Sequence, residues 1–146
     1  MADEIPPPAG PPPAGPPASG PGAWLHVDDD GRATLFGGSS ASSGRIHFPP
    51  AGRCPYTGSD DIEIVALPRR GTLWAWTAVT SAPPGYEGPV PYGFGIVELD
   101  DVGLRLVTRL TVPDVDALAF GQPMRLVVDE LPDGLAVWAF EPDDAA

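Results

Sequence analysis

The chain has 146 residues, of which 20 are acidic and 8 are basic, giving a formal net charge of −12. This length fits one domain with a short extra segment, and the acidic balance disfavours binding to nucleic-acid phosphates. Cys54 is the one cysteine, so no disulfide can form within the chain. We find no secretory leader and no apolar run of about 18 residues, so we expect a cytoplasmic protein without a membrane span.

Residues 1–22 consist mainly of proline, alanine, glycine and serine. Such a segment cannot bury enough apolar surface to offset the entropy lost on ordering, so we predict disorder with polyproline II character. The proline triplets at 6–8 and 11–13 could also dock on an aromatic groove. The composition favours the simpler interpretation, a solubilising spacer.

Residues 23–68 alternate between short apolar runs and turn residues. Residues 24–27 and 32–36 flank Asp-Asp-Asp-Gly, and Asp-Gly between two apolar runs predicts a β-hairpin. We expect residues 37–44, which are glycine, serine and alanine, to form a flexible loop. Further strands are predicted at 45–50 and 62–67, on either side of a turn-rich stretch.

Residues 69–141 predict a small barrel or sandwich. Strands are expected at 73–79, 92–99, 104–110, 124–129 and 135–140, and one helical turn at 115–119. Both sets of alternating residues in 73–79 are apolar near its centre, which predicts a strand covered on both faces. Residues 81–91 form a long Pro/Gly/Tyr loop. The whole chain therefore predicts about nine strands and almost no helix.

Catalytic signatures are absent from the sequence. The Gly93–Gly95 pair lacks the third glycine of a dinucleotide-binding motif. Cys54 could be a nucleophile with His26 or His47 as its base, but a lone cysteine before proline in a turn is more typical of a structural residue. We therefore expect a chain without an active site of its own.

Aromatic residues gather around the 81–91 loop, and they allow two interpretations. They could form the barrel core and anchor the loop, or they could form a partly exposed apolar surface for a protein partner or an acyl chain. These interface candidates are Trp74, Trp76, Tyr86, Tyr92 and Phe94.

The order and spacing of several short segments resemble the DUF35 family, in which a rubredoxin-like zinc ribbon precedes an OB-fold. The resemblance spans roughly residues 35–141. The segments that carry it are 48–50, 54–55, 58–63, 70–74, 91–99, 105–110 and 121–124.

The ribbon departs from the family pattern at its metal ligands. Where the family has two Cys-x-x-Cys knuckles, this chain has Ser40, Ser43, Cys54 and Thr57. Neutral hydroxyls cannot replace thiolates in a structural zinc site, so we predict a ribbon-like hairpin pair without metal. The acidic hairpin at 28–31 also departs from the helical lead-in that the resemblance implies.

The resemblance implies an all-β chain with a five-stranded OB-fold barrel behind a metal-free, zinc-ribbon-like element. We expect four parts: a disordered tail (1–22), the ribbon-like element (23–68), the OB-fold (69–141) and an acidic C-terminal tail (142–146).

The resemblance also implies a function in acyl-CoA metabolism. We expect a non-catalytic accessory subunit without a cofactor, in a hetero-oligomer with a thiolase-like, ketosynthase, hydratase or aldolase partner. A stand-alone module for acyl-CoA or another lipid ligand is the alternative, with a local site from Arg69, Arg70, Arg105 and Arg109. An OB-fold that binds single-stranded nucleic acid is disfavoured, because such proteins need a positive groove.

Overall fold

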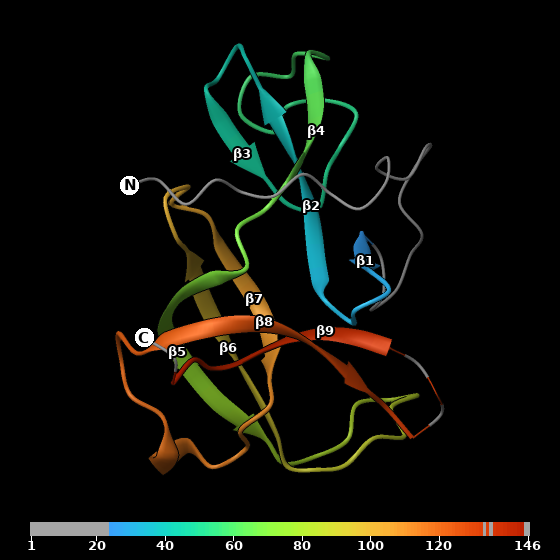
Figure 1. The fold of residues 1–146 in the computed structure, drawn as a ribbon, viewed down its shortest axis with the longest axis vertical. Helices are drawn as coiled ribbons and strands as arrows, with labels where there is room; N and C mark the ends of the chain where they lie inside the picture. Colours follow the sequence, from blue (N-terminus) through green and yellow to red (C-terminus); the bar gives the residue numbers. More distant parts are fainter. Residues whose placement is uncertain (1–23, 133, 135, 145–146) are drawn as a thin grey trace.

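The computed structural model describes residues 24–132, 134 and 136–144, so the predicted tail at 1–22 lies outside the described residues. Within them the chain forms two connected β-structures (Figure 1). The first is a four-stranded sheet of β1 (Leu25–Val27), β2 (Ala33–Ser40), β3 (Arg45–His47) and β4 (Ile62–Ala66). The second is a barrel of β5 (Arg70–Val79), β6 (Tyr92–Leu99), β7 (Arg105–Leu110), β8 (Pro123–Glu130) and β9 (Ala136–Pro142), with the 3-10 turn η1 (Val115–Ala117) between β7 and β8.

Strand β2 is the centre of the first sheet. Its first residues pair with β1, and its last residues pair with β3 on one side and β4 on the other. The hairpin predicted at 28–31 is confirmed: Asp28 Oδ1 accepts the amide hydrogens of Asp30 and Arg32, and Gly31 adopts a φ of +81°. Glycine suits this turn because it enters the left-handed region without a Cβ clash.

The prediction of a flexible loop at 37–44 is wrong for its first half, because residues 37–40 belong to β2. Both glycines there are buried by packing. A Cβ on Gly37 would lie 2.7 Å from the His47 carbonyl oxygen, and one on Gly38 would lie 2.4 Å from His47 Nε2. Glycine therefore allows close approach of a neighbouring strand, a role that composition does not distinguish from that of a linker.

The barrel closes in the order β5–β6–β7–β9–β8, and β8 returns to pair with β5. Strands β7 and β9 are parallel, and the other neighbours are antiparallel. This closed five-stranded mixed barrel confirms the predicted OB-fold and the all-β class. The described residues include no helix long and apolar enough to cross a membrane.

A β-bulge in β5 changes the predicted alternation of side chains. The register with β6 shifts between Leu73 and Ala75, so Trp74 is the extra residue. Leu73 and Trp76 pack on the barrel core, whereas Trp74 and Ala75 are both exposed. The expectation that this strand is covered on both faces is therefore wrong at its centre.

One hydrophobic core joins the two β-structures. Leu35 and Leu67, from the first sheet and the chain that leaves it, belong to the same buried cluster as Leu73, Val97 and Phe140 of the barrel. At its margin the Phe48 and Trp138 rings meet edge to face, with centroids 5.6 Å apart. The shared core fixes the first sheet against the barrel.

Gly95 offers a test of barrel closure. A Cβ at this position would lie 2.3 Å from the Ala75 carbonyl oxygen, so Gly95→Ala overpacks the pairing of β5 with β6. We expect it to lower the free energy of unfolding by about 1–3 kcal/mol, measured by urea denaturation. Gly52→Ala is the matched control, because no atom lies within 4 Å of its added Cβ. Equal denaturation midpoints for the two variants would contradict this account of the close approach.

Candidate functional site

The outward side of β5, β6 and β7 carries a largely apolar surface. Two cross-strand rows build it: Ala75, Ile96 and Val107 form one row, and Thr77 and Phe94 begin the next. Val107, at the β7 end of the first row, is 59% exposed, and Phe94 is 39% exposed. We call this surface the outer face and define it as Trp74, Ala75, Thr77, Phe94, Ile96 and Val107.

Trp74 forms one border of the outer face. The Arg105 guanidinium stacks over its ring at 3.7 Å from the centroid, and Phe120 meets the ring edge-on with centroids 5.4 Å apart. Arg105 Nε also donates to Glu98 Oε1 at 3.1 Å. The bulge at Trp74 thus presents an ordered aromatic pair, of which Phe120 is 65% exposed.

Arg109 forms the opposite border and organises the 81–91 loop. Its Nε donates to Asp129 Oδ2 at 2.8 Å, and one terminal nitrogen donates to the Tyr86 hydroxyl at 3.2 Å. The guanidinium also lies 4.6 Å from the Tyr92 ring centroid. Burial lowers the pKa of Arg109, but the hydrogen bonds to Asp129 and Tyr86 outweigh it, and the net pKa is raised. Arg109 is therefore a charged and already paired group.

A groove runs beside this border. Its cavity volume is about 320 Å³, and apolar and aromatic side chains dominate its walls. The Tyr86 and Tyr92 rings are tilted against each other with centroids 5.0 Å apart. We call it the aromatic groove; its lining residues are Tyr86, Tyr92, Phe94, Val107, Thr108, Arg109, Leu131, Val137 and Trp138.

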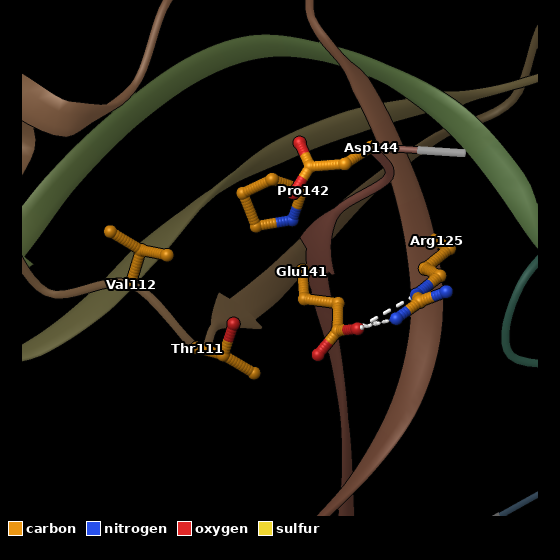
Figure 2. Close-up of a pocket in the computed structure, with 6 residues that line it drawn as sticks. All are labelled: Thr111, Val112, Arg125, Glu141, Pro142 and Asp144. Carbon is orange, nitrogen blue, oxygen red and sulfur yellow. Dashed lines mark hydrogen bonds and ion pairs between the residues drawn. The ribbon is translucent and has the colours of Figure 1, made fainter. Parts of the chain in front are cut away.

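A second hollow of about 620 Å³ lies at the end of β9 (Figure 2). Thr111, Val112, Arg125, Glu141, Pro142 and Asp144 line it. Its one basic side chain, Arg125, forms an ion pair with Glu141, which Figure 2 shows as dashed lines. No nucleophile with a neighbouring base is found among these lining residues, so the hollow offers no catalytic arrangement.

The structure brings four of the five aromatic interface candidates to these surfaces. Trp74 and Phe94 lie on the outer face, and Tyr86, Tyr92 and Phe94 line the aromatic groove. Trp76 lies on the opposite side of β5, packs on the core, and donates its indole N–H to the Val115 carbonyl at 2.9 Å. The candidates therefore divide between surface and core.

Sequence reasoning missed Val107, Phe120 and Trp138. Val107 lies between Arg105 and Arg109 in a strand of alternating side chains, so the sequence indicated only an ordinary position in a half-buried strand. Trp138 is distant in sequence from the loop aromatics and joins them only through barrel closure. No local sequence pattern could have identified Val107 or Trp138 as part of these surfaces.

The four positions at which the family has zinc ligands come together in the knuckle between β2 and β4. Cys54, whose side chain is 2% exposed, hydrogen-bonds through Sγ to Ser43 Oγ at 3.4 Å. Ser40 Oγ donates to Asp61 Oδ1 at 2.8 Å. Ser42 links the two sides by contacts to Asp61 and to Thr57 Oγ1. We call this set the hydroxyl cluster: Ser40, Ser42, Ser43, Cys54, Thr57 and Asp61.

Hydrogen bonds decide the electrostatics of the hydroxyl cluster. Burial alone would raise the pKa of the Cys54 thiol, but hydrogen bonding, with Ser43 as the largest contributor, lowers its pKa to about 6. Hydrogen bonds, first among them that from Ser40, also lower the pKa of Asp61. His47 does not act on the thiol, because its Nε2 accepts the Ala51 amide hydrogen at 3.1 Å.

This donor set does not fit structural zinc. One sulfur and three neutral hydroxyls surround the position where four thiolates would be needed, and the hydroxyls of Ser40 and Ser42 are already engaged with Asp61. Hydrogen bonds join the residues at these four positions, and a knuckle without metal stays a prediction.

Comparison with known proteins agrees with the fold. A family model described as the C-terminal OB-fold domain of ChsH2 matches residues 64–129. The DUF35 domain-containing scaffold protein of Pyrococcus furiosus is 28% identical over 122 residues, which are 81% of this chain and 87% of that protein. Benzoylsuccinyl-CoA thiolase subunit BbsA of Thauera aromatica is 31% identical over 87 residues, which are 59% of this chain and 58% of that protein.

A solved structure extends the likeness to three dimensions. A chain of the Ltp2-ChsH2(DUF35) aldolase superposes with a TM-score of 0.60 and 30% sequence identity, over 75% of this chain and 84% of that chain. An OB-fold barrel with a small sheet in front of it therefore defines the class of this protein. The chain belongs to the DUF35 family, which confirms the resemblance seen in the sequence.

Asp61→Asn tests the hydroxyl cluster through its pH dependence. The pKa of Asp61 in the folded chain lies below its unfolded value of about 3.9, so the ionised carboxylate stabilises the fold above about pH 3.9. This stabilisation is lost as the pH falls through the folded-state pKa. We expect the variant to unfold at lower urea concentration than the wild type at about pH 7, with the difference shrinking below about pH 3. Asp60→Asn is the control; a pH-independent difference for Asp61→Asn would contradict the linkage.

Metal analysis tests the interpretation of the knuckle. We expect the purified natural chain to hold no stoichiometric zinc, because hydroxyls replace three thiolates. The variant Ser40→Cys, Ser43→Cys, Thr57→Cys should bind one zinc per chain, since those positions surround Cys54. Zinc in the natural chain, or its absence from the triple variant, would show that the knuckle geometry is misassigned.

Proposed function

We propose that this chain is a non-catalytic accessory subunit of an acyl-CoA enzyme and docks on a thiolase-like partner through the outer face. The related partner classes are ketosynthases, hydratases and aldolases. The observation that carries the proposal is the exposed apolar surface of Val107 and Phe94 on the outer face, which Arg105 and Arg109 border. Apolar and aromatic centres with arginine at their margins are typical of protein interfaces.

The names of the relatives support a subunit role. One is called a scaffold protein, one is a thiolase subunit, and one forms part of an aldolase complex. The chemistry of this chain agrees with that role. Among the described residues, Cys54 has hydroxyl neighbours in place of an imidazole base, so it lacks the partner that a catalytic thiol uses.

Three of the four arginines considered for a stand-alone acyl-CoA site already have acidic partners, and the fourth, Arg69, is half-buried. Phosphate groups of CoA need accessible cations. Arg105 is paired with Glu98 and Arg109 with Asp129, while Arg70 lies 3.2 Å from Asp143. The surface around the paired arginines is therefore better suited to bind a protein than a polyphosphate. The net charge of −12 also disfavours binding of a polyphosphate.

The first test is reconstitution with the partner. A tagged chain is purified from the cells that encode it, and the thiolase-like protein that copurifies in fixed ratio is then expressed and purified alone. We expect the two purified proteins to coelute on size exclusion and the isolated chain to show no turnover of CoA thioesters. A partner that elutes unchanged in the mixture, or turnover by this chain alone, would overturn the proposal.

Val107→Glu then tests the outer face. A carboxylate buried in an interface loses its hydration, and the neighbouring Arg105 and Arg109 are already paired with Glu98 and Asp129. The affinity for the partner should therefore fall at least about tenfold, which corresponds to about 1.4 kcal/mol. Val27→Glu is the matched control, since Val27 is also an exposed valine but lies on β1. Equal affinities for the two variants, measured by calorimetry, would place the interface elsewhere.

A further inference from the structure

The aromatic groove has the chemistry of a polyproline site. Its walls present the rings of Tyr86, Tyr92, Phe94 and Trp138, with Val107 between them. Proline-rich ligands in the polyproline II conformation bind grooves lined by such rings, because the stiff helix packs pyrrolidine rings between flat aromatic faces at low entropic cost. The groove is open along the surface, and the 81–91 loop that forms one wall is fixed by the bonds of Tyr86 to Pro89 and Arg109.

The same chain contains a proline-rich segment of the kind that such aromatic grooves bind. Pro-Pro-Pro-Ala-Gly occurs twice in succession, at residues 6–10 and 11–15, and Pro16 and Pro17 follow. No charged residue occurs between 6 and 23, so the segment can approach a chain of net charge −12 without repulsion and can dock without desolvating a charge.

Chain length allows this segment to reach the groove. From Pro17 to Trp24 an extended backbone spans up to about 24 Å. Only this linker has to span the distance when residues 6–17 are docked. Its length exceeds the radius of gyration of about 14 Å expected of a compact domain of about 120 residues, so the segment can reach a groove on the same side of the molecule. Figure 1 shows β1, where the described residues begin, on the same side of the molecule as the start of β9, the strand that carries Trp138.

We propose that the proline-rich segment at residues 6–17 docks in the aromatic groove of its own chain. The tether strengthens this docking, because a short linker holds the segment at an effective concentration in the millimolar range. The docked segment covers Tyr92, Phe94 and Trp138 and shields their apolar surface from water. The docking needs only this chain. Because Phe94 and Val107 belong to both the aromatic groove and the outer face, the docked segment would compete there with the partner of the proposed function.

Paramagnetic relaxation in the full chain tests the proposal. Ala14→Cys introduces a thiol beside the second proline triplet, and a nitroxide label is attached there. Cys54 is 2% exposed, so the label reacts selectively with the new thiol, which mass spectrometry verifies. In ¹⁵N spectra we expect the amide signals of Tyr92 and Phe94 and the indole signal of Trp138 to lose most of their intensity, while those of the knuckle residues Thr57 and Gly58 keep theirs.

The control replaces Pro6–Pro8 and Pro11–Pro13 by serine in the same labelled chain. This change lies outside the described residues and should abolish the selective broadening. Undiminished broadening in the serine variant would overturn the proposal. Uniform broadening over the whole surface in the natural sequence would also overturn it. A mixture of ¹⁵N-labelled natural chain with nitroxide-labelled ¹⁴N chain should show no broadening; broadening there would assign the groove to the segment of a second copy.

Discussion

Closure of the barrel at β5 is the constraint on which the exposed surfaces depend. β5 pairs with β6 along its length and with β8 at its start, so its backbone must approach both neighbours while it bends. Gly71 permits the approach, because a Cβ there would lie 2.4 Å from the Glu98 carbonyl oxygen. The bulge at Trp74 supplies the bend, as bulges do in barrels. Because the bulge shifts the register by one residue, Trp74 turns outward and Trp76 turns inward.

The same closure assembles surfaces from distant parts of the chain. It places β9 beside β7, which brings Trp138 to the groove that Tyr92 and Phe94 line. Arg109 sits where these parts meet, and its bonds to Asp129 and Tyr86 connect the barrel wall to the 81–91 loop. A rigid wall of this kind provides a preorganised surface, which reduces the entropy lost when a partner binds.

Hydrogen bonds join the residues of the knuckle. Hydroxyls surround the single thiol, and Asp61 accepts hydrogen bonds from two of the serines. The small sheet is also packed on the barrel through the shared core around Leu35 and Leu67. A knuckle without metal, as the sequence predicts, would therefore be compatible with the fold, because the sheet does not stand alone.

The sequence by itself determined most of the strands, the Asp-Gly hairpin and a small barrel or sandwich, because these rest on local patterns of apolar and turn residues. The resemblance to the DUF35 family then indicated the OB-fold. The prediction of a flexible loop at Gly37 and Gly38 was wrong, because the sequence does not distinguish a glycine in a flexible loop from one packed against a neighbouring histidine. Only the tertiary structure decided which aromatic side chains face water. That choice depends on the bulge at Trp74 and on the closure that joins Trp138 to the groove, and both arise from strand pairing between residues far apart in the chain.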